Sequence, residues 1–163
     1  MEQVKCPNCS RQFVRRVSSV GAAETLLGLF SIYPFKCQLC GCRFRLPQRG
    51  MRDVRAAKER RQYDRMAVNF PLSFHAVNLG GQGTVTSVSM GGCRFHTLTP
   101  LAHDSVIRLR LQLSSDISPV TVDEAAVRYA QEGWVGVEFL RWQERERDRL
   151  QLFLRGLLIA QTV

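Results

Sequence analysis

Alternating apolar and polar residues give the clearest pattern in the second half of the chain. In SVIRLRLQL (105–113) apolar residues alternate with two arginines and a glutamine, which predicts a strand with one buried face. VNFPLSFHAVNL (68–79) alternates in the same way, and its apolar face consists of Phe70, Leu72, Phe74 and Ala76. Further short strands are predicted at GQGTVTSVS, CRFHTL, PVTVDEAAVRYA and GWVGVEFLRW. Because turn-forming residues separate these segments, the pattern favours a small antiparallel barrel or a sandwich.

The period changes at the end of the chain. In ERERDRLQLFLRGLLIAQ (144–161) the apolar residues fall at helical spacing, which predicts an amphipathic helix. Its apolar face consists of Leu150, Phe153, Leu154, Leu157 and Leu158. Two uses fit this face: packing against the barrel as part of its core, or forming a homodimer seam with a second copy.

The first half of the chain carries two CxxC motifs, CPNC and CQLC, with 27 residues between them. A CxxC turn directs two thiolates to one centre, and two such turns complete the tetrahedral sulfur site that suits Zn²⁺. The expected ligands of this structural zinc ribbon are Cys6, Cys9, Cys37 and Cys40. A disulfide or redox role, or unliganded thiols, are the alternatives. We interpret Cys42 as a bystander or spare ligand, and Cys93 as a small buried side chain.

These patterns predict three segments. Residues 1–46 form the zinc ribbon, 47–65 form a basic linker that becomes helical near VRAAKER, and 66–163 form the barrel with its terminal helix. Within the ribbon, LLGLFSIYPF (26–35) is predicted to be an apolar loop. It either packs within the ribbon or on the barrel, or provides a docking surface for a partner or a membrane face.

Composition narrows the class of protein. Of the 163 residues, 45% are hydrophobic and 23% are charged, as in folded proteins. Residues 1–65 hold 14 Lys and Arg against 5 Asp and Glu, and the remaining residues hold nine of each, so the whole net charge of +9 lies in the first 65 residues. This asymmetry indicates an anionic partner there, nucleic acid among the candidates. With neither a signal peptide nor an apolar run long enough to span a bilayer, we expect a cytoplasmic protein.

Nothing in the sequence favours an enzyme. The three histidines are scattered, and the chain has no Ser/His/Asp order, paired carboxylates or phosphate-binding loop. We therefore predict a binding protein.

Two motifs outside the ribbon indicate which ligand the protein binds. ERRQYDR (59–65) contains an RxxxR element, and TSVSMGGCRF (86–95) contains a Ser-x-Ser-x-x-Gly turn. Together with GWVGVEFL before a terminal helix, they make residues 59–160 resemble a PilZ domain. This family is a six-stranded antiparallel Greek-key barrel that binds the bacterial second messenger cyclic di-GMP. In the family's binding motifs, Arg61 and Arg65 match the RxxxR element, and Ser89 and Gly92 match the turn, with Ser87 at its first position. We add their neighbours Arg60 and Gly91 to the predicted ligand-binding residues.

The resemblance implies a cyclic di-GMP receptor, and we hypothesise that the zinc ribbon relays the signal to a protein partner. Arginine suits such a ligand, because its planar fork binds phosphate, guanine edges and base faces. One position departs from the family, which usually has Asp or Asn where this chain has Ser87. A neutral acceptor in place of a charge-assisted one weakens affinity by roughly tenfold. The alternatives are a ligand-free adaptor for protein partners and a nucleic-acid-binding zinc-ribbon protein.

Overall fold

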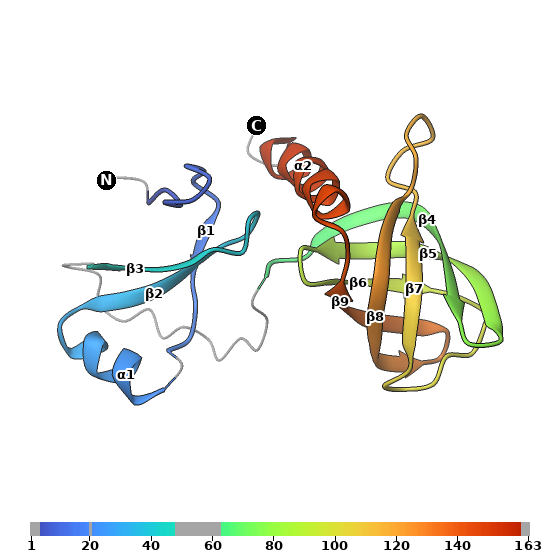
Figure 1. The fold of residues 1–163 in the computed structure, drawn as a ribbon, viewed down its shortest axis with the longest axis horizontal. Coiled ribbons are helices and arrows are strands. Elements are labelled where there is room, and N and C mark those ends of the chain that lie inside the picture. The colour runs from blue at the N-terminus through green and yellow to red at the C-terminus, as the bar shows by residue number, and fades with distance from the viewer. Residues whose placement is uncertain (1–3, 20, 48–62, 161–163) are drawn as a thin grey trace. The chain divides into compact units, whose positions relative to one another are not determined.

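The computed structural model describes residues 4–19, 21–47 and 63–160 and divides the chain into two compact units, Met1–Asp64 and Arg65–Val163. Figure 1 shows the strands and short helix of the first unit, and the barrel and terminal helix of the second. The helix predicted near VRAAKER lies outside the described residues. Of the predicted linker, Pro47 belongs to the last strand of the first unit, and Tyr63 and Asp64 belong to that unit as well. Neither helix in the described part of the chain has the length and apolar character needed to cross a lipid bilayer.

The first unit is a three-stranded antiparallel sheet with one short helix. Its strands are β1 (Val14–Arg16), β2 (Ile32–Cys37) and β3 (Arg43–Pro47), in the order β1-β2-β3. The helix α1 (Ala22–Leu29) connects β1 to β2 and packs against β2 (Figure 1). Two arginines of β3 hold α1 in place, because Arg43 and Arg45 donate to the buried carboxylate of Glu24 at 2.5 and 3.1 Å.

The apolar segment 26–35 is not the single loop that the sequence predicted. Its first part completes α1, and its second part is strand β2, where Phe35 is buried and stacks on Phe44 of β3. The part of this segment that lies in β2 therefore packs within the ribbon, as one of the two expectations had it. The helical half differs, because Leu26, Leu29 and Phe30 are 60%, 80% and 76% exposed.

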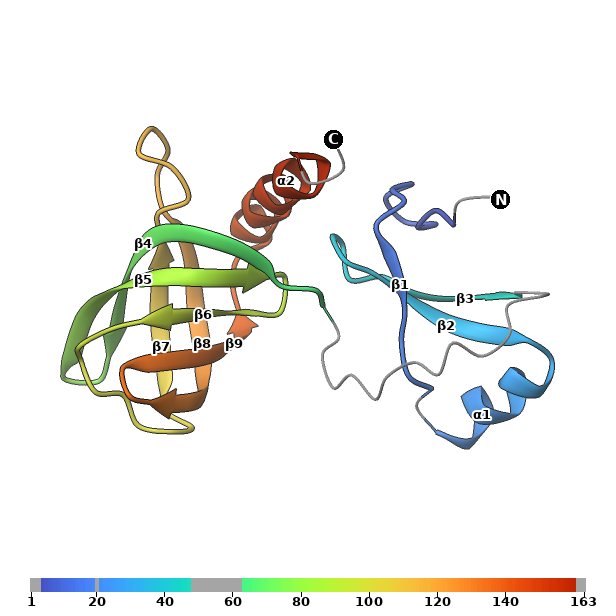
Figure 2. The same ribbon diagram turned by 180° about the vertical axis from the view of Figure 1, so that it is seen from behind.

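The second unit is a closed antiparallel barrel in the strand order β4-β5-β6-β9-β8-β7, which confirms the predicted six-stranded Greek-key fold. Its strands are β4 (Met66–Ala76), β5 (Leu79–Ser89), β6 (Gly92–His96), β7 (Val106–Leu111), β8 (Val120–Gln131) and β9 (Trp134–Arg141). The connection from β6 to β7 breaks the sequential order and places β9 beside β6 (Figure 2).

Alternation along the strands fills the barrel as predicted. In SVIRLRLQL the alternating Ile107, Leu109, Leu111 and Leu113 are buried, while Arg108, Arg110 and also Val106 are exposed. Phe70, Leu72 and Phe74 of β4 are buried as well. Ala76, at the strand's end, is only half-buried. The core therefore lies inside the barrel, and the polar members of each strand form its outer surface.

Helix α2 (Glu144–Ala160) packs against β4 and β8, through the buried Leu150 and Leu154. The ring of Phe153 meets that of Phe70 edge-on at 5.8 Å. Packing against the barrel is thus what the described residues show for this helix. A homodimer seam along α2 stays a prediction.

Candidate functional site

The four predicted metal ligands lie together in the first unit. Their sulfur atoms are all within 4.8 Å of one another, and the closest pairs are Cys6–Cys40 at 3.5 Å and Cys9–Cys37 at 3.6 Å. Disulfide sulfurs lie about 2.05 Å apart, so these pairs are not bonded. Tetrahedral Zn²⁺ with Zn–S bonds of about 2.3 Å requires sulfurs roughly 3.8 Å apart. The cluster has the donor set and the spacing for that ion.

The two CxxC turns share one backbone geometry. The N–H of Ser10 donates to the carbonyl of Cys6, and the N–H of Gly41 donates to the carbonyl of Cys37. Both of these closing residues have positive φ, 57° for Ser10 and 75° for Gly41. The repeated turn aims both members of each pair at one centre.

The pKa values of the cysteine thiols show why a cation suits this cluster. Burial is the largest influence on the Cys6 thiol and opposes its ionisation, but the N–H groups of Cys9 and Asn8 and the neighbouring thiols outweigh it and lower its pKa to about 7. Burial raises the pKa of Cys9 and of Cys37. Four thiolates close together therefore require a positive charge among them. Cys42 lies outside the cluster, and the buried thiol of Cys93 lies in the barrel.

In the barrel, strand register brings the predicted binding motifs together. Met66, the first residue of β4, pairs with Val88 near the end of β5, so one further step along the register places Arg65 opposite Ser89. Figure 2 shows the start of β4 and the end of β5 at the same end of the barrel. The charge of Arg65 also reaches β6, because it partly offsets the burial that raises the pKa of Cys93 to about 12. Arg65 thus lies beside the Ser-x-Ser-x-x-Gly turn, whereas Arg60 and Arg61 lie outside the described residues.

The turn itself is tight and held by Ser89. Its buried hydroxyl donates to the carbonyl of Gly92 at 3.2 Å and accepts from the N–H of Gly91 at 3.3 Å. A Cβ at Gly92 would lie 2.1 Å from the carbonyl oxygen of Val137, so only glycine allows β9 to pass this close. Ser89 and Gly92 therefore shape the turn.

Ser87 lies on the outer face and joins neighbours that the sequence analysis did not identify. It pairs with Ala67 on one side and with Arg94 on the other, and Arg94 pairs in turn with Gly136. The Arg94 guanidinium lies over the ring of Trp134, 4.6 Å from its centroid. The alternation of CRF, with Cys93 and Phe95 buried, is the signal that could have placed Arg94 outside, next to Ser87.

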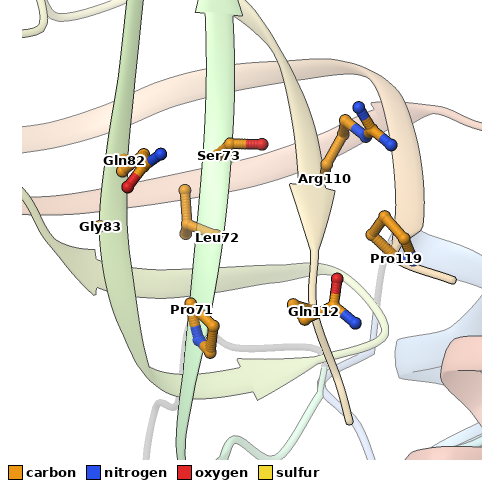
Figure 3. A pocket seen from close by; sticks show the side chains of 8 residues that line it. All are labelled: Pro71, Leu72, Ser73, Gln82, Gly83, Arg110, Gln112 and Pro119. Carbon is orange, nitrogen blue, oxygen red and sulfur yellow. The ribbon is translucent and has the colours of Figure 1, made fainter. Parts of the chain in front are cut away.

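A separate depression of about 380 Å³ lies on the outer face of β4, β5 and β7. Figure 3 shows Gln82, Ser73 and Arg110 side by side across its three strands, in agreement with their register pairing. Of the predicted binding residues that the structure describes, none lines this depression. It is open to solvent, and the candidate site predicted from the motifs is the separate β5–β6 turn.

Comparison with known proteins agrees with this architecture. The PilZ domain family matches residues 59–156. Among solved structures, the complex of MrkH from K. pneumonia with c-di-GMP has a TM-score of 0.53 at 15% identity, covering 80% of this chain and 72% of that one. YcgR from Escherichia coli in complex with c-di-GMP has a TM-score of 0.52 at 15% identity, covering 91% and 75%.

The inhibitor of motility MotI/DgrA from Bacillus subtilis has a TM-score of 0.50 at 15% identity. The match covers 74% of this chain and about half, 54%, of MotI. No curated protein matches the chain. Because the family match extends over more than half of the sequence, the chain belongs to the PilZ domain family.

Proposed function

We propose that this protein is a non-enzymatic receptor for cyclic di-GMP, with a structural zinc ion in its N-terminal unit. The proposal is supported by the family match and by the fold shared with MrkH and YcgR, whose structures contain c-di-GMP. The observation that carries it is the register of β4 and β5, which puts Arg65 beside the Ser-x-Ser-x-x-Gly turn.

The ligand's chemistry fits this surface. Cyclic di-GMP offers two phosphates and two guanines, and arginine can bind either group with two parallel hydrogen bonds or stack on a base. Arg65 and Arg61 form the proposed clamp, with Arg60 beside them. Ser87 accepts from a guanine N–H, while the backbone of Gly91 and Gly92 allows the ligand to approach closely.

Arg94 adds a further contact in this proposal. Its guanidinium lies over the ring of Trp134, and this contact restricts its orientation before any ligand arrives. Preorganised side chains lose less entropy on binding. A base resting on the outer face next to Ser87 would meet this arginine directly.

In the N-terminal unit, Cys6, Cys9, Cys37 and Cys40 would hold zinc. Four thiolates leave no open coordination position, so the ion supplies folding free energy and no catalysis. The unit then relays ligand binding to a protein partner. The nucleic-acid alternative gains no support from this unit, since Arg15, Arg43 and Arg45 already pair with carboxylates.

Titration calorimetry of the full chain with cyclic di-GMP tests the receptor. We expect micromolar or tighter binding, and no binding of GTP or cyclic di-AMP. Because hydrogen bonds to charged groups contribute about 1.5–3 kcal/mol, Arg65→Ala and Arg61→Ala should each weaken binding by about ten- to 150-fold.

Two variants sharpen this experiment. Ser87→Asp should strengthen binding by roughly tenfold, because a charged acceptor replaces a neutral one. Arg110→Ala removes an exposed arginine from the depression of Figure 3 and should leave affinity unchanged. Absence of binding by the unmodified chain at high ligand concentration would contradict the proposed function, and a large effect of Arg110→Ala would move the site to the depression.

A further inference from the structure

The two residues before Arg65 are bound by the N-terminal unit. The carboxylate of Asp64 forms an ion pair with Arg15, and its backbone N–H donates to Oε1 of Gln38 at 2.7 Å. The ring of Tyr63 lies under the ammonium group of Lys36, 4.2 Å from the ring centroid. We call Tyr63 and Asp64, with these contacts, the anchor.

Gln38 connects the anchor to the metal cluster. It is the first residue between the two cysteines of CQLC, directly after Cys37. Its side chain is only 9% exposed, and its amide nitrogen donates to the carbonyl of Lys36 at 3.3 Å. With its amide group held at both ends, Gln38 places the Asp64 backbone according to the geometry of the second cysteine turn.

The anchor also restrains the residue that follows it along the chain. With the anchor, Asp64 is held and Arg65 follows one Cα step of about 3.8 Å later. Arg65 is therefore restrained on both sides, by the anchor and by the first pair of β4.

We propose that Asp64 and Gln38 are positioning residues for Arg65, through which the four-cysteine cluster controls the affinity of the ligand site. This inference rests on the proposed function. The ordered cluster fixes the Gln38 amide, which fixes the Asp64 backbone and so limits the positions that Arg65 can occupy. Zinc and cyclic di-GMP then bind cooperatively, and each strengthens the other by the same factor. An Arg65 that is restrained beforehand loses less conformational entropy when the ligand binds.

Calorimetry on zinc-loaded full chain provides the test. We expect Gln38→Ala and Asp64→Ala each to weaken cyclic di-GMP binding by about three- to tenfold. Asp148→Ala, which removes an exposed carboxylate from α2, should change nothing. Arg15→Asp should weaken binding like Asp64→Ala, and the charge-reversed pair Arg15→Asp with Asp64→Arg should restore most of the affinity.

The effect of zinc removal on ligand binding distinguishes a positioning role of Gln38 and Asp64 from a general loss of folding. In the unmodified chain, chelating the metal should weaken ligand binding by the same three- to tenfold. In the double variant Gln38→Ala/Asp64→Ala, chelation should have no further effect, while metal content stays at one zinc per chain. Equal affinities in the unmodified chain and both single variants would overturn the inference and leave the receptor proposal intact, and tighter binding by the variants would overturn it as well.

A ligand-free measurement keeps the inference testable by itself. The backbone order parameter of Arg65 from ¹⁵N relaxation should be about 0.85 in the unmodified chain and fall below about 0.6 in the double variant. An unchanged value would show that the anchor does not restrain Arg65. Loss of ligand binding by the unmodified chain would instead count against the proposed function.

Discussion

The described part of the second unit, the barrel with its terminal helix, buries twenty-two hydrophobic side chains. The described part of the N-terminal unit buries four, of which two are cysteines: Cys6, Phe35, Cys37 and Leu39. A core of that size contributes little stability by burial, because small units cannot remove enough apolar surface from water. We therefore predict that the barrel folds by packing alone, while the first unit depends on the proposed bond between its cysteines and a metal. The two units should respond differently to the same chemical treatments.

Metal removal should produce the largest difference in folding between the two units. A chelator, or Cys37→Ser, should abolish tetrahedral Co²⁺–thiolate absorption and collapse the dispersed amide signals of the first unit, since its folding depends on the ion. Both tryptophans, Trp134 and Trp142, lie in the barrel, so the thermal transition of their fluorescence should remain.

Cys42→Ser is the matched control for that experiment. Cys42 lies two residues after Cys40 but outside the cluster, so its substitution should preserve Co²⁺ absorption. Loss of absorption in this variant would make Cys42 a ligand. A barrel that unfolds on chelation would refute the prediction that the barrel folds without help from the first unit.

A core substitution should produce the reverse pattern. Leu109 of β7 is completely buried in the barrel, and Leu109→Ala should lower the free energy of unfolding by about 2–5 kcal/mol. Urea denaturation followed by tryptophan fluorescence measures this loss. Co²⁺ absorption should persist at urea concentrations that unfold the variant barrel. Leu98, which is 94% exposed, provides the control, since Leu98→Ala should change stability by no more than about 0.5 kcal/mol.

The smallest effect concerns the ion pairs that Arg43 and Arg45 of β3 form with Glu24 of α1. Glu24→Gln removes the charge that Arg43 and Arg45 share and should cost the first unit about 1–2 kcal/mol. Arg43→Gln should cost more than Arg45→Gln, because Arg43 is less exposed and also donates to the carbonyl of Ser18. Amide hydrogen exchange in α1 measures both. The opposite ranking of the two arginine variants would contradict the contacts described for Glu24 and its two arginines.

The sequence was most informative where a regular pattern reflects burial. Alternation predicted the barrel strands, helical spacing predicted α2, and CxxC spacing predicted the cysteine cluster, because each pattern follows from local geometry. The helix α1 was missed because its eight residues expose Leu26 and Leu29, so they do not form the one-sided stripe that marks a packed helix.

The neighbourhood of the ligand site was only partly predictable. Arg65 and the Ser-x-Ser-x-x-Gly turn are local motifs, but their proximity depends on the pairing of Met66 with Val88. The contact of Asp64 with Gln38 joins positions 26 residues apart, and no local pattern encodes it. The same holds for Arg94 and Trp134, which meet only because β9 lies beside β6.

The irregularity near the start of β4 limits how the chain length can vary. Ala67 pairs with Ser87, and Phe70 pairs with Val85. Between these two pairs β4 has two residues and β5 has one, so β4 holds one extra residue there. Deleting that residue, or inserting another, would turn every position before it to the opposite face of the barrel. Arg65 would then face away from the turn. The spacing between Arg65 and Phe70 is thus expected to tolerate no single-residue insertion or deletion, even where each substitution in it is harmless.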